Sequence, residues 1–481
     1  MDSAIKALKP EQVWNYFYEL SQIPRESGNE DGVRQYLLAF AKKYSLEAIT
    51  DKTGNVIIRK SASKGFENRP SVALQGHMDM VCVKTQESRH NFLTDPIELV
   101  LTGDFLHAKD TTLGGDNGIA IAIALDILSD PECKHGPLEA IFTVSEETGL
   151  TGAFGIEKET IKSRLLLNLD SEEEGVLYIG CAGGLEVRAQ LPSVLEDIPS
   201  GYQAFSLTSK GMLGGHSGGE IHKQRANAIK AVARALVQVQ TKMLFSAEGG
   251  TKRNVIPSTC TISFAAPVAD APAIAAIVEK TGKELSLEFG ISDPGIKLEF
   301  VEAPLPKQAA NASQSEAFIR SLYIAPHGVD AMSFTIPGVV ETSSNLAILR
   351  FQNGIFSVIS SHRSSVLSAR DDVAHRMGEA LRSCGATVSY EGAYPSWTPN
   401  PSSKLTAFCA KAYEEYAKKK PVITAIHAGL ECGIINSQVP GMDSVSFGPD
   451  MFDVHSVKEK ISVSSVERIC GFTRHLLSII E

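Results

Sequence analysis

Apolar positions along the first part of the chain switch between helical and strand-like spacing. They recur every three to four residues over 9–22 and again over 30–44, which predicts two amphipathic helices. An Ala-rich apolar stretch at 118–126 is typical of a buried helix. Short β-rich runs lie around it, at 55–59, 71–75, 139–144 and 164–168. Strands that alternate with helices predict an α/β domain whose sheet is covered on both faces.

The pattern changes after about residue 186. Residues 187–390 alternate strand-like stretches with Ala-rich helices such as Arg225–Val239 and Ala271–Lys283. A Pro-rich joint at Tyr394–Pro401 follows. Beyond it, α/β character returns, with a helix at 402–418, a strand at 421–426 and a helix at 464–480. We therefore expect one catalytic domain made of residues 1–186 and 391–481, interrupted by an inserted domain of residues 187–390.

Composition narrows the class of protein. A chain of 481 residues is long enough for two domains. The formal net charge of −10 argues against nucleic acid as a partner, because phosphate binding needs a basic surface. There is no apolar run long enough for a membrane span and no signal-peptide pattern at the N-terminus. The eight cysteines are scattered along the chain, which is typical of a cytoplasmic protein with reduced thiols. We expect no membrane partner.

Polar residues with metal-binding chemistry gather where the predicted strands end. His77 and Asp79 directly follow the strand at 71–75 and point the same way on a continuing strand. A histidine can ligate zinc, and a nearby carboxylate can hold it in place. Asp116 lies among glycines before the buried helix, where the alternative interpretation is a helix N-cap by Asp116 or Asn117.

Three further segments carry such groups. Glu146 and Glu147 follow the strand at 139–144, and adjacent carboxylates are costly to bring together unless a cation neutralises them. The alternative there is a solvated acidic loop. Asp170 follows the strand at 164–168, beside a run at 172–174 that reads as a solvated face. His455 lies in a Gly/Pro loop, where a lone histidine is more often structural.

The combination is more specific than any of its parts. Mixed histidine and carboxylate donors at strand ends suit a pair of divalent ions, zinc above all, with manganese or cobalt as substitutes.

The order of these motifs resembles a known family. GHMDMVC (76–82), TLGGDNGIA (112–120), EETGLTGA (146–153), GGHSGGEIH (214–222), RNVIP (253–257) and HAGLECG (427–433) are similar to segments of the co-catalytic two-zinc peptidases. That family includes carboxypeptidases, aminoacylases, tripeptidases and dipeptidases. The resemblance runs from residue 5 to 481 and is strongest to the dipeptidase branch. It implies an α/β catalytic domain, with a mixed sheet flanked by helices, and an inserted α+β lid domain.

The resemblance also implies roles for individual residues. His77 and Asp170 would bind one zinc ion, Glu147 and His455 the other, and Asp116 both. Glu146 would be the general base and Asp79 would orient the His77 region. His216 would polarise the scissile carbonyl from the lid, with a turn residue in a Gly-rich loop as the alternative. The weaker assignments, all to substrate binding, are Asn254, Arg363 and Glu431.

The resemblance implies that the protein hydrolyses dipeptides, either with broad specificity or with a preference for Xaa-His. It also implies a homodimer. Aminoacylases, deacetylases and tripeptidases of the same family share the metal ligands, so the metal motifs do not separate them. An insertion of about 200 residues, longer than the lids expected for many deacylases, favours the dipeptidase branch. A non-catalytic binding or scaffolding protein on the same fold would have lost the base or a ligand, whereas Glu146 and all five implied ligands are present.

Overall fold

The computed structural model describes residues 3–481, so residues 1 and 2 of the first predicted catalytic segment lie outside the described residues. Two compact units make up the chain. The first combines the residues up to Gly180 with Pro399–Ala425 and Leu430–Glu481, and the second comprises Cys181–Thr398 and Ile426–Gly429. Each unit has its own hydrophobic core.

The first unit is built from helices and short strands. Its helices are α1 (Ser3–Lys6), α2 (Glu11–Ser21), α3 (Asp31–Lys43), α4 (Gly115–Ser129), α5 (Thr151–Phe154), α10 (Lys404–Ala417), α11 (Glu431–Gln438) and α12 (Val463–Ile479). Its strands are β1 (Glu47–Thr50), β2 (Val56–Lys60), β3 (Val72–His77), β4 (Leu99–Thr102), β5 (Phe105–Ala108), β6 (Leu138–Thr143), β7 (Leu165–Asn168), β8 (Val176–Cys181), β22 (Val422–Ile426), β23 (Asp443–Ser446), β24 (Met451–Phe452) and β25 (Lys460–Ser462).

An eight-stranded mixed sheet forms the centre of this unit, in the order β1-β2-β6-β3-β7-β23-β8-β22. The four central strands β6, β3, β7 and β23 run parallel, while β1, β2 and β8 pair antiparallel at the flanks. Parallel strands end at the same edge of a sheet, so the segments that follow β3, β6, β7 and β23 meet there.

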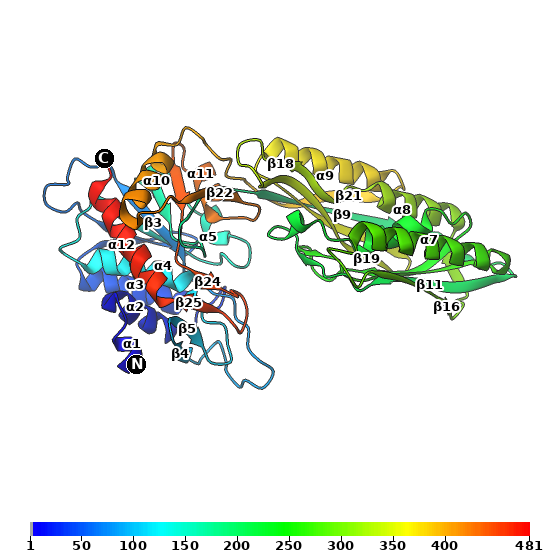
Figure 1. The fold of residues 1–481 in the computed structure, drawn as a ribbon, viewed down its shortest axis with the longest axis horizontal. Coiled ribbons are helices and arrows are strands. Elements are labelled where there is room, and N and C mark those ends of the chain that lie inside the picture. The colour runs from blue at the N-terminus through cyan, green and yellow to red at the C-terminus, as the bar shows by residue number, and fades with distance from the viewer. Residues whose placement is uncertain (1–2) are drawn as a thin grey trace. The chain divides into compact units, whose positions relative to one another are not determined.

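Helix α4 lies at the core of the first unit. It is apolar on every side, as expected of a helix without a solvent face, and it packs against β3, α2 and α12. Asp126, its buried acidic residue, accepts a hydrogen bond from Nη2 of Arg474 on α12 at 2.6 Å. Figure 1 shows α12 lying beside α10, which it also contacts. This packing fixes the start of α4, where Asp116 lies.

The second unit is an antiparallel sheet with helices. Its strands are β9 (Gly183–Pro192), β10 (Leu195–Asp197), β11 (Tyr202–Lys210), β12 (Gly215–His216), β13 (Met243–Gly249), β14 (Val255–Ile256), β15 (Cys260–Pro267), β16 (Lys297–Ala303), β17 (Gln308–Ala310), β18 (Gly328–Met332), β19 (Val340–Gln352), β20 (Ile355–Ser364) and β21 (Thr387–Tyr394). Its helices are α6 (Ala228–Leu236), α7 (Ala271–Phe289), α8 (Ala312–Ile324) and α9 (Leu367–Arg382).

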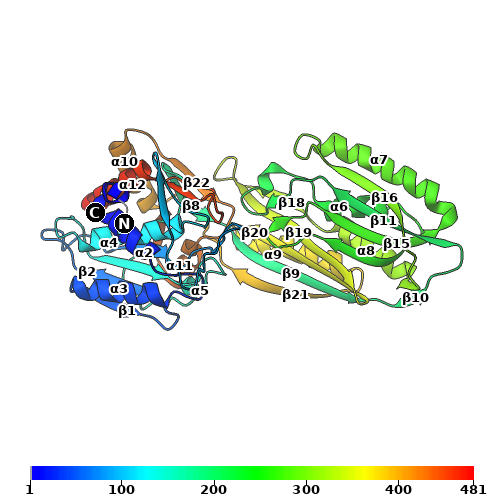
Figure 2. The same ribbon diagram turned by 90° about the horizontal axis from the view of Figure 1, so that it is seen from below.

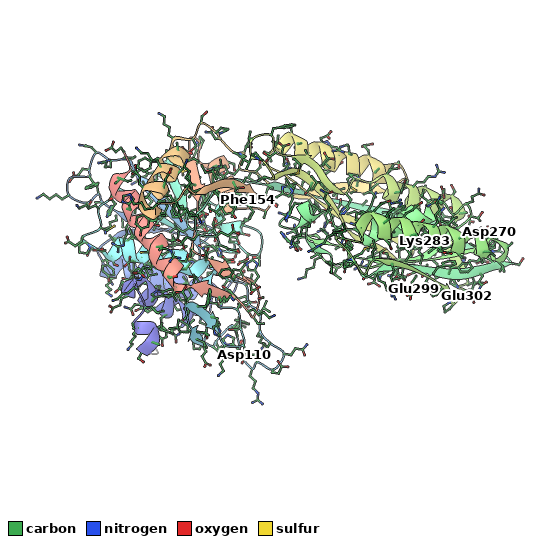
Figure 3. The ribbon with its side chains drawn as sticks, viewed as in Figure 1. Asp110, Phe154, Asp270, Lys283, Glu299 and Glu302 are labelled. Carbon is green, nitrogen blue, oxygen red and sulfur yellow. The ribbon has the colours of Figure 1, made fainter. Side chains whose placement is uncertain are left out.

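Nine of these strands form one sheet in the order β16-β11-β15-β13-β19-β20-β9-β21, with β18 paired to β19. Figure 2 shows β16, β11 and β15 side by side, with α7 running along them. The outer strand β16 carries the charged residues Glu299 and Glu302, which Figure 3 labels. Charges on an edge strand oppose pairing with another sheet.

The predicted elements agree with the structure apart from their ends. The helices expected over 9–22 and 30–44 are α2 and α3, and the expected α/β class is confirmed. Helix α6 starts later than the predicted residue 225 because Asn227 caps it, accepting from the N–H groups of Ile229 and Lys230. Among residues 3–481, no helix is long and apolar enough to cross a membrane.

Candidate metal centre

Three parallel strands bring the predicted site residues to one sheet edge. β3 ends at His77, which lies opposite Thr143 at the end of β6, three residues before Glu146. On its other side, Gln75 lies opposite Asn168 at the end of β7, two residues before Asp170. The register of the sheet therefore places the His77, Glu146 and Asp170 segments next to each other.

The carboxylate of Asp116 lies between two histidines. Its Oδ1 is 2.9 Å from Nε2 of His77, and its Oδ2 is 3.0 Å from Nε2 of His455. Asp116 and Asn117 have non-helical backbone angles, so the regular part of α4 begins after them. The side chain of Asn117 accepts the His77 N–H at 3.2 Å and donates to the carbonyl of Leu169 at 3.1 Å. The alternative interpretation as a helix cap stays a prediction. In a site with two ions, each oxygen of the Asp116 carboxylate would be available to one of them.

Each histidine also contacts a second carboxylate. Oδ1 of Asp170 is 3.5 Å from Nε2 of His77, and Oε1 of Glu147 is 3.0 Å from Nε2 of His455. Ligand atoms of His77, Asp116 and Asp170 lie within 4.8 Å of one another, and so do those of Asp116, Glu147 and His455. The His77 side chain is 1% exposed, whereas that of His455 is 47% exposed, so the group opens to solvent at His455.

Crowded carboxylates dominate the electrostatics of the group. Burial raises the pKa of Asp170 to about 6. Burial also raises the pKa of Glu146 well above its ordinary value, and Asp170 and Glu147 add to the effect. Burial lowers the pKa of His455, but the carboxylates of Asp116 and Glu147 outweigh this effect and raise the pKa to about 11. A site that attracts positive charge this strongly, with nitrogen and oxygen donors only, fits a pair of divalent cations.

Asp79 holds the segments that carry the donors. Its Oδ1 accepts the Glu146 N–H at 3.0 Å and lies 3.2 Å from Nδ1 of His77, while its Oδ2 accepts the Glu147 N–H at 3.2 Å. Burial opposes ionisation of Asp79, but these bonds and one from Ser27 lower its pKa to about 2. Asp79 is fully buried, which suits a residue that orients others and does not meet substrate.

Two segments of the site adopt backbone conformations that cost energy. Ser145, just before Glu146, has φ of 49°, and His455 has φ of 61°. Non-glycine residues in this left-handed region cost of order 1–3 kcal/mol and persist where the surroundings impose them. Both segments are therefore held in place by their contacts.

A buried polar network beneath the site was not predicted. Nε2 of Gln75 and Oγ1 of Thr143 both donate to Oε2 of Glu431 at 2.6 Å, and Nδ2 of Asn168 donates to Oε1 of Gln75 at 2.5 Å. Glu431 is fully buried, and burial raises its pKa to about 7. The substrate contact of Glu431 stays a prediction. In the structure its carboxylate accepts hydrogen bonds from one residue of β3 and one of β6. In the sequence, this network is indicated only by the polar residues Gln75 and Asn168, which lie within apolar strands.

The remaining predicted residues lie in the second unit. His216 is on β12, and its Nδ1 accepts the Gly219 N–H at 3.0 Å, which leaves the ring proton on Nε2. The backbone carbonyl of Asn254 accepts the Ser217 N–H at 2.9 Å, so Asn254 lies beside the His216 loop. Arg363 on β20 donates to the hydroxyl of Tyr394 at 3.0 Å, and its buried Nε has no hydrogen-bond partner in the described chain.

A mixed sheet flanked by helices, with histidines and carboxylates at its carboxyl edge, is typical of a metal-dependent enzyme. The model of peptidase family M20/M25/M40 matches residues 73–478, and the chain belongs to this family of metal-dependent peptidases. The predicted family resemblance is confirmed.

Individual relatives cover nearly the whole chain. It is 36% identical over 467 residues to the cytosol non-specific dipeptidase of Escherichia coli (strain K12), covering 96% of each chain. The structure of aminoacylhistidine dipeptidase from Vibrio alginolyticus matches with a TM-score of 0.91 and 37% identity, covering 99% of this chain and 98% of that one. A tripeptidase from Staphylococcus aureus matches with a TM-score of 0.57 and 14% identity, covering 98% and 99%, which shows the fold alone.

The position of Asp116 generates a test of the metal site. For a centre that holds two ions, Asp116→Ala should remove both, because the lost carboxylate contacts both histidines. His455→Ala should remove one ion, because His77 with its carboxylates stays intact. Elemental analysis of the dialysed proteins measures ions per chain.

Asp104→Ala serves as the control, because Asp104 accepts from Ser462 and Ser464 outside the donor group. It should keep the full metal content. Equal losses in the Asp116 and His455 variants would contradict the assignment.

Proposed function

We propose that the chain is a cytoplasmic dipeptidase that uses two zinc ions, with manganese or cobalt as substitutes, to hydrolyse dipeptides of broad sequence or of the Xaa-His type. The observation that carries this proposal is the Asp116 carboxylate, which directs one oxygen to His77 and the other to His455. The names of the Escherichia coli and Vibrio alginolyticus proteins support the substrate class, and the former supports the compartment.

Five residues would hold the ions. His77 and Asp170 would bind one, and Glu147 and His455 the other, in line with their contacts. Asp116 would bind both. When bound, the two ions supply Lewis acidity that polarises a carbonyl and lowers the pKa of a water molecule toward about 7.

Glu146 would act as the general base. Its carboxylate reaches the donor group beside His77 and Glu147, and Asp79 holds its backbone through the Glu146 N–H. In its ionised form Glu146 would take a proton from the attacking water and then return it to the leaving amine. No covalent intermediate is needed.

His216 would donate to the oxygen of the scissile carbonyl. Because Nδ1 accepts from Gly219, Nε2 carries the proton that such a bond requires. Asn254 lies beside this loop, and Arg363 offers a guanidinium for the substrate carboxylate. In this proposal the second unit, predicted as residues 187–390, acts as a lid that supplies these groups.

The alternative is an aminoacylase, deacetylase or tripeptidase of the same family. These enzymes would use the same donor group, so the metal site does not discriminate among them. Similarity above 35% to two dipeptidases over nearly the whole chain favours the dipeptidase, whereas the tripeptidase matches at 14%.

Replacing the base tests the mechanism. Glu146→Gln should keep metal and fold but lower kcat by about a thousand-fold, because the amide is nearly isosteric and cannot accept a proton. Steady-state kinetics with a simple dipeptide measures the loss. Glu173→Gln, an exposed control in the neighbouring acidic run, should retain activity, and near-normal kcat in the Glu146 variant would refute the role.

A substrate profile tests the class of substrate. Dipeptides with a free amino group and a free carboxylate should be hydrolysed fastest, because short peptides are selected by their two charged ends. N-acetylated dipeptides and tripeptides should be poorer. If an N-acyl amino acid outperformed every dipeptide, the aminoacylase alternative would be correct.

We include a homodimer in this proposal on the strength of the family resemblance. His216→Ala should lower kcat strongly and leave the metal content unchanged; normal kcat would remove His216 from the mechanism. Mixing this variant with Glu146→Gln, under conditions that exchange subunits, should restore activity if His216 acts on the partner's site. No recovery, with exchange confirmed by mass, would place His216 in its own subunit's site.

A further inference from the structure

Glu459 ends the loop that carries His455, and it contacts the segment that carries Asp116, another proposed metal ligand. It follows His455 by four residues, and only 3% of it is exposed. Buried carboxylates persist where hydrogen bonds satisfy them, so its partners define its role.

Four successive backbone amides donate to this one carboxylate. Oε2 accepts the N–H groups of Leu113 at 2.7 Å and Gly114 at 3.2 Å, and Oε1 accepts those of Gly115 at 2.8 Å and Asp116 at 3.4 Å. These amides precede the regular part of α4, because Asp116 and Asn117 have non-helical backbone angles. Buried amides outside regular structure need acceptors, and Glu459 supplies them from a distant segment.

A buried arginine holds the same segment from another side. Arg25 donates to the carbonyl of Gly114 and, at 3.0 Å, to that of Asp79. The two peptide groups of Gly114 are thus held by opposite charges, the N–H by Glu459 and the carbonyl by Arg25. Gly114 has φ of 69°, a left-handed conformation that favours glycine, and a Cβ there would crowd Nη2 of Arg25.

The His455 loop is closed at its base. β24 pairs with β25, with Met451 opposite Ile461, and the Glu459 N–H donates to the carbonyl of Ser456 at 3.1 Å. Through Glu459, this closed loop is attached to the backbone of Asp116. The contacts of Asp116 with His77 and His455, at 2.9 and 3.0 Å, require both loops to keep their positions.

We propose that Glu459 is a positioning residue that fixes residues 113–116 against the His455 loop, so that the Asp116 carboxylate can serve both metal ions. This inference rests on the proposed two-ion site and deepens it. Its physical basis is a set of charge-assisted hydrogen bonds to backbone groups, which need no contact with substrate.

The chain offers a matched control. Glu139, 2% exposed, also accepts backbone amides, from Lys162 at 2.9 Å and Ser163 at 2.6 Å. It lies near the start of β6, at the end of the strand away from Glu146 and Glu147. Glu139→Gln therefore removes a buried structural carboxylate of the same unit without touching the donor group.

The experiment compares Glu459→Gln with Glu139→Gln in the full-length protein. Hydrogen exchange of the metal-free proteins reports on the amides of residues 113–116. Competition with a chromogenic chelator measures Zn²⁺ affinity, and kinetics with a dipeptide separates kcat from KM. We expect Glu459→Gln to speed exchange at 113–116, lower Zn²⁺ affinity by about 10–100-fold and lower kcat with little change in KM.

Glu139→Gln should lower the melting temperature and leave Zn²⁺ affinity and kcat within about twofold, since its partners lie outside the site. Glu459→Asp, which keeps the charge on a shorter side chain, should recover part of the affinity, and it replaces the glutamine variant if that fails to fold. Unchanged affinity and exchange in Glu459→Gln, or equal losses in the Glu139 variant, would overturn the proposal.

Failure of the proposed function is distinguishable from failure of this inference. If the wild-type protein binds Zn²⁺ but hydrolyses no dipeptide, the function is wrong, and the affinity and exchange comparison still decides the role of Glu459. If the wild type is active and the Glu459 variants match it in affinity, the positioning role is wrong and the function stands.

Discussion

The site depends on one carboxylate that lies between two histidines. Asp116 can contact His77 through Oδ1 and His455 through Oδ2 only if the start of α4, the end of β3 and the C-terminal loop are held together. These segments are far apart in the sequence, so their alignment is a property of the tertiary fold. Because the surrounding carboxylates repel one another, such an arrangement is stable only with compensating positive charge. That requirement links the fold to a metal-dependent chemistry.

The fold meets this requirement with parallel strands and buried charged groups. The shared edge of β3, β6 and β7 delivers the segments of His77, Glu147 and Asp170, whereas Asp116 comes from the start of α4 and His455 from the loop after β24. Backbone amides are then held by carboxylates: Asp79 accepts from Glu146 and Glu147, Glu30 accepts from Ser145 at 2.9 Å, and Glu459 accepts from residues 113–116. The donors are thus preorganised by neighbouring carboxylates that bind the backbone of the donor segments.

The sequence predicted the α/β class, and it marked three of the donor segments because His77, Glu147 and Asp170 follow apolar runs. His77 and Asp79 were visible through their spacing on a strand, and Asp116 through its glycine-rich surroundings. Glu459 and Arg25 were not predicted, because their partners are backbone groups more than 50 residues away and such contacts leave no local pattern. Glu431 carried a motif-based substrate role, but its burial against Gln75 and Thr143 depends on tertiary packing that no spacing reveals.

The central claim is that one chain holds two ions and that hydrolysis needs both. Titration of the metal-free protein with Zn²⁺, followed simultaneously by calorimetry and by dipeptide hydrolysis, tests it most directly. We expect two ions to bind per chain, with activity that becomes maximal only when both sites are filled. Saturation and full activity at one ion per chain, or dipeptide hydrolysis by the metal-free protein, would contradict it.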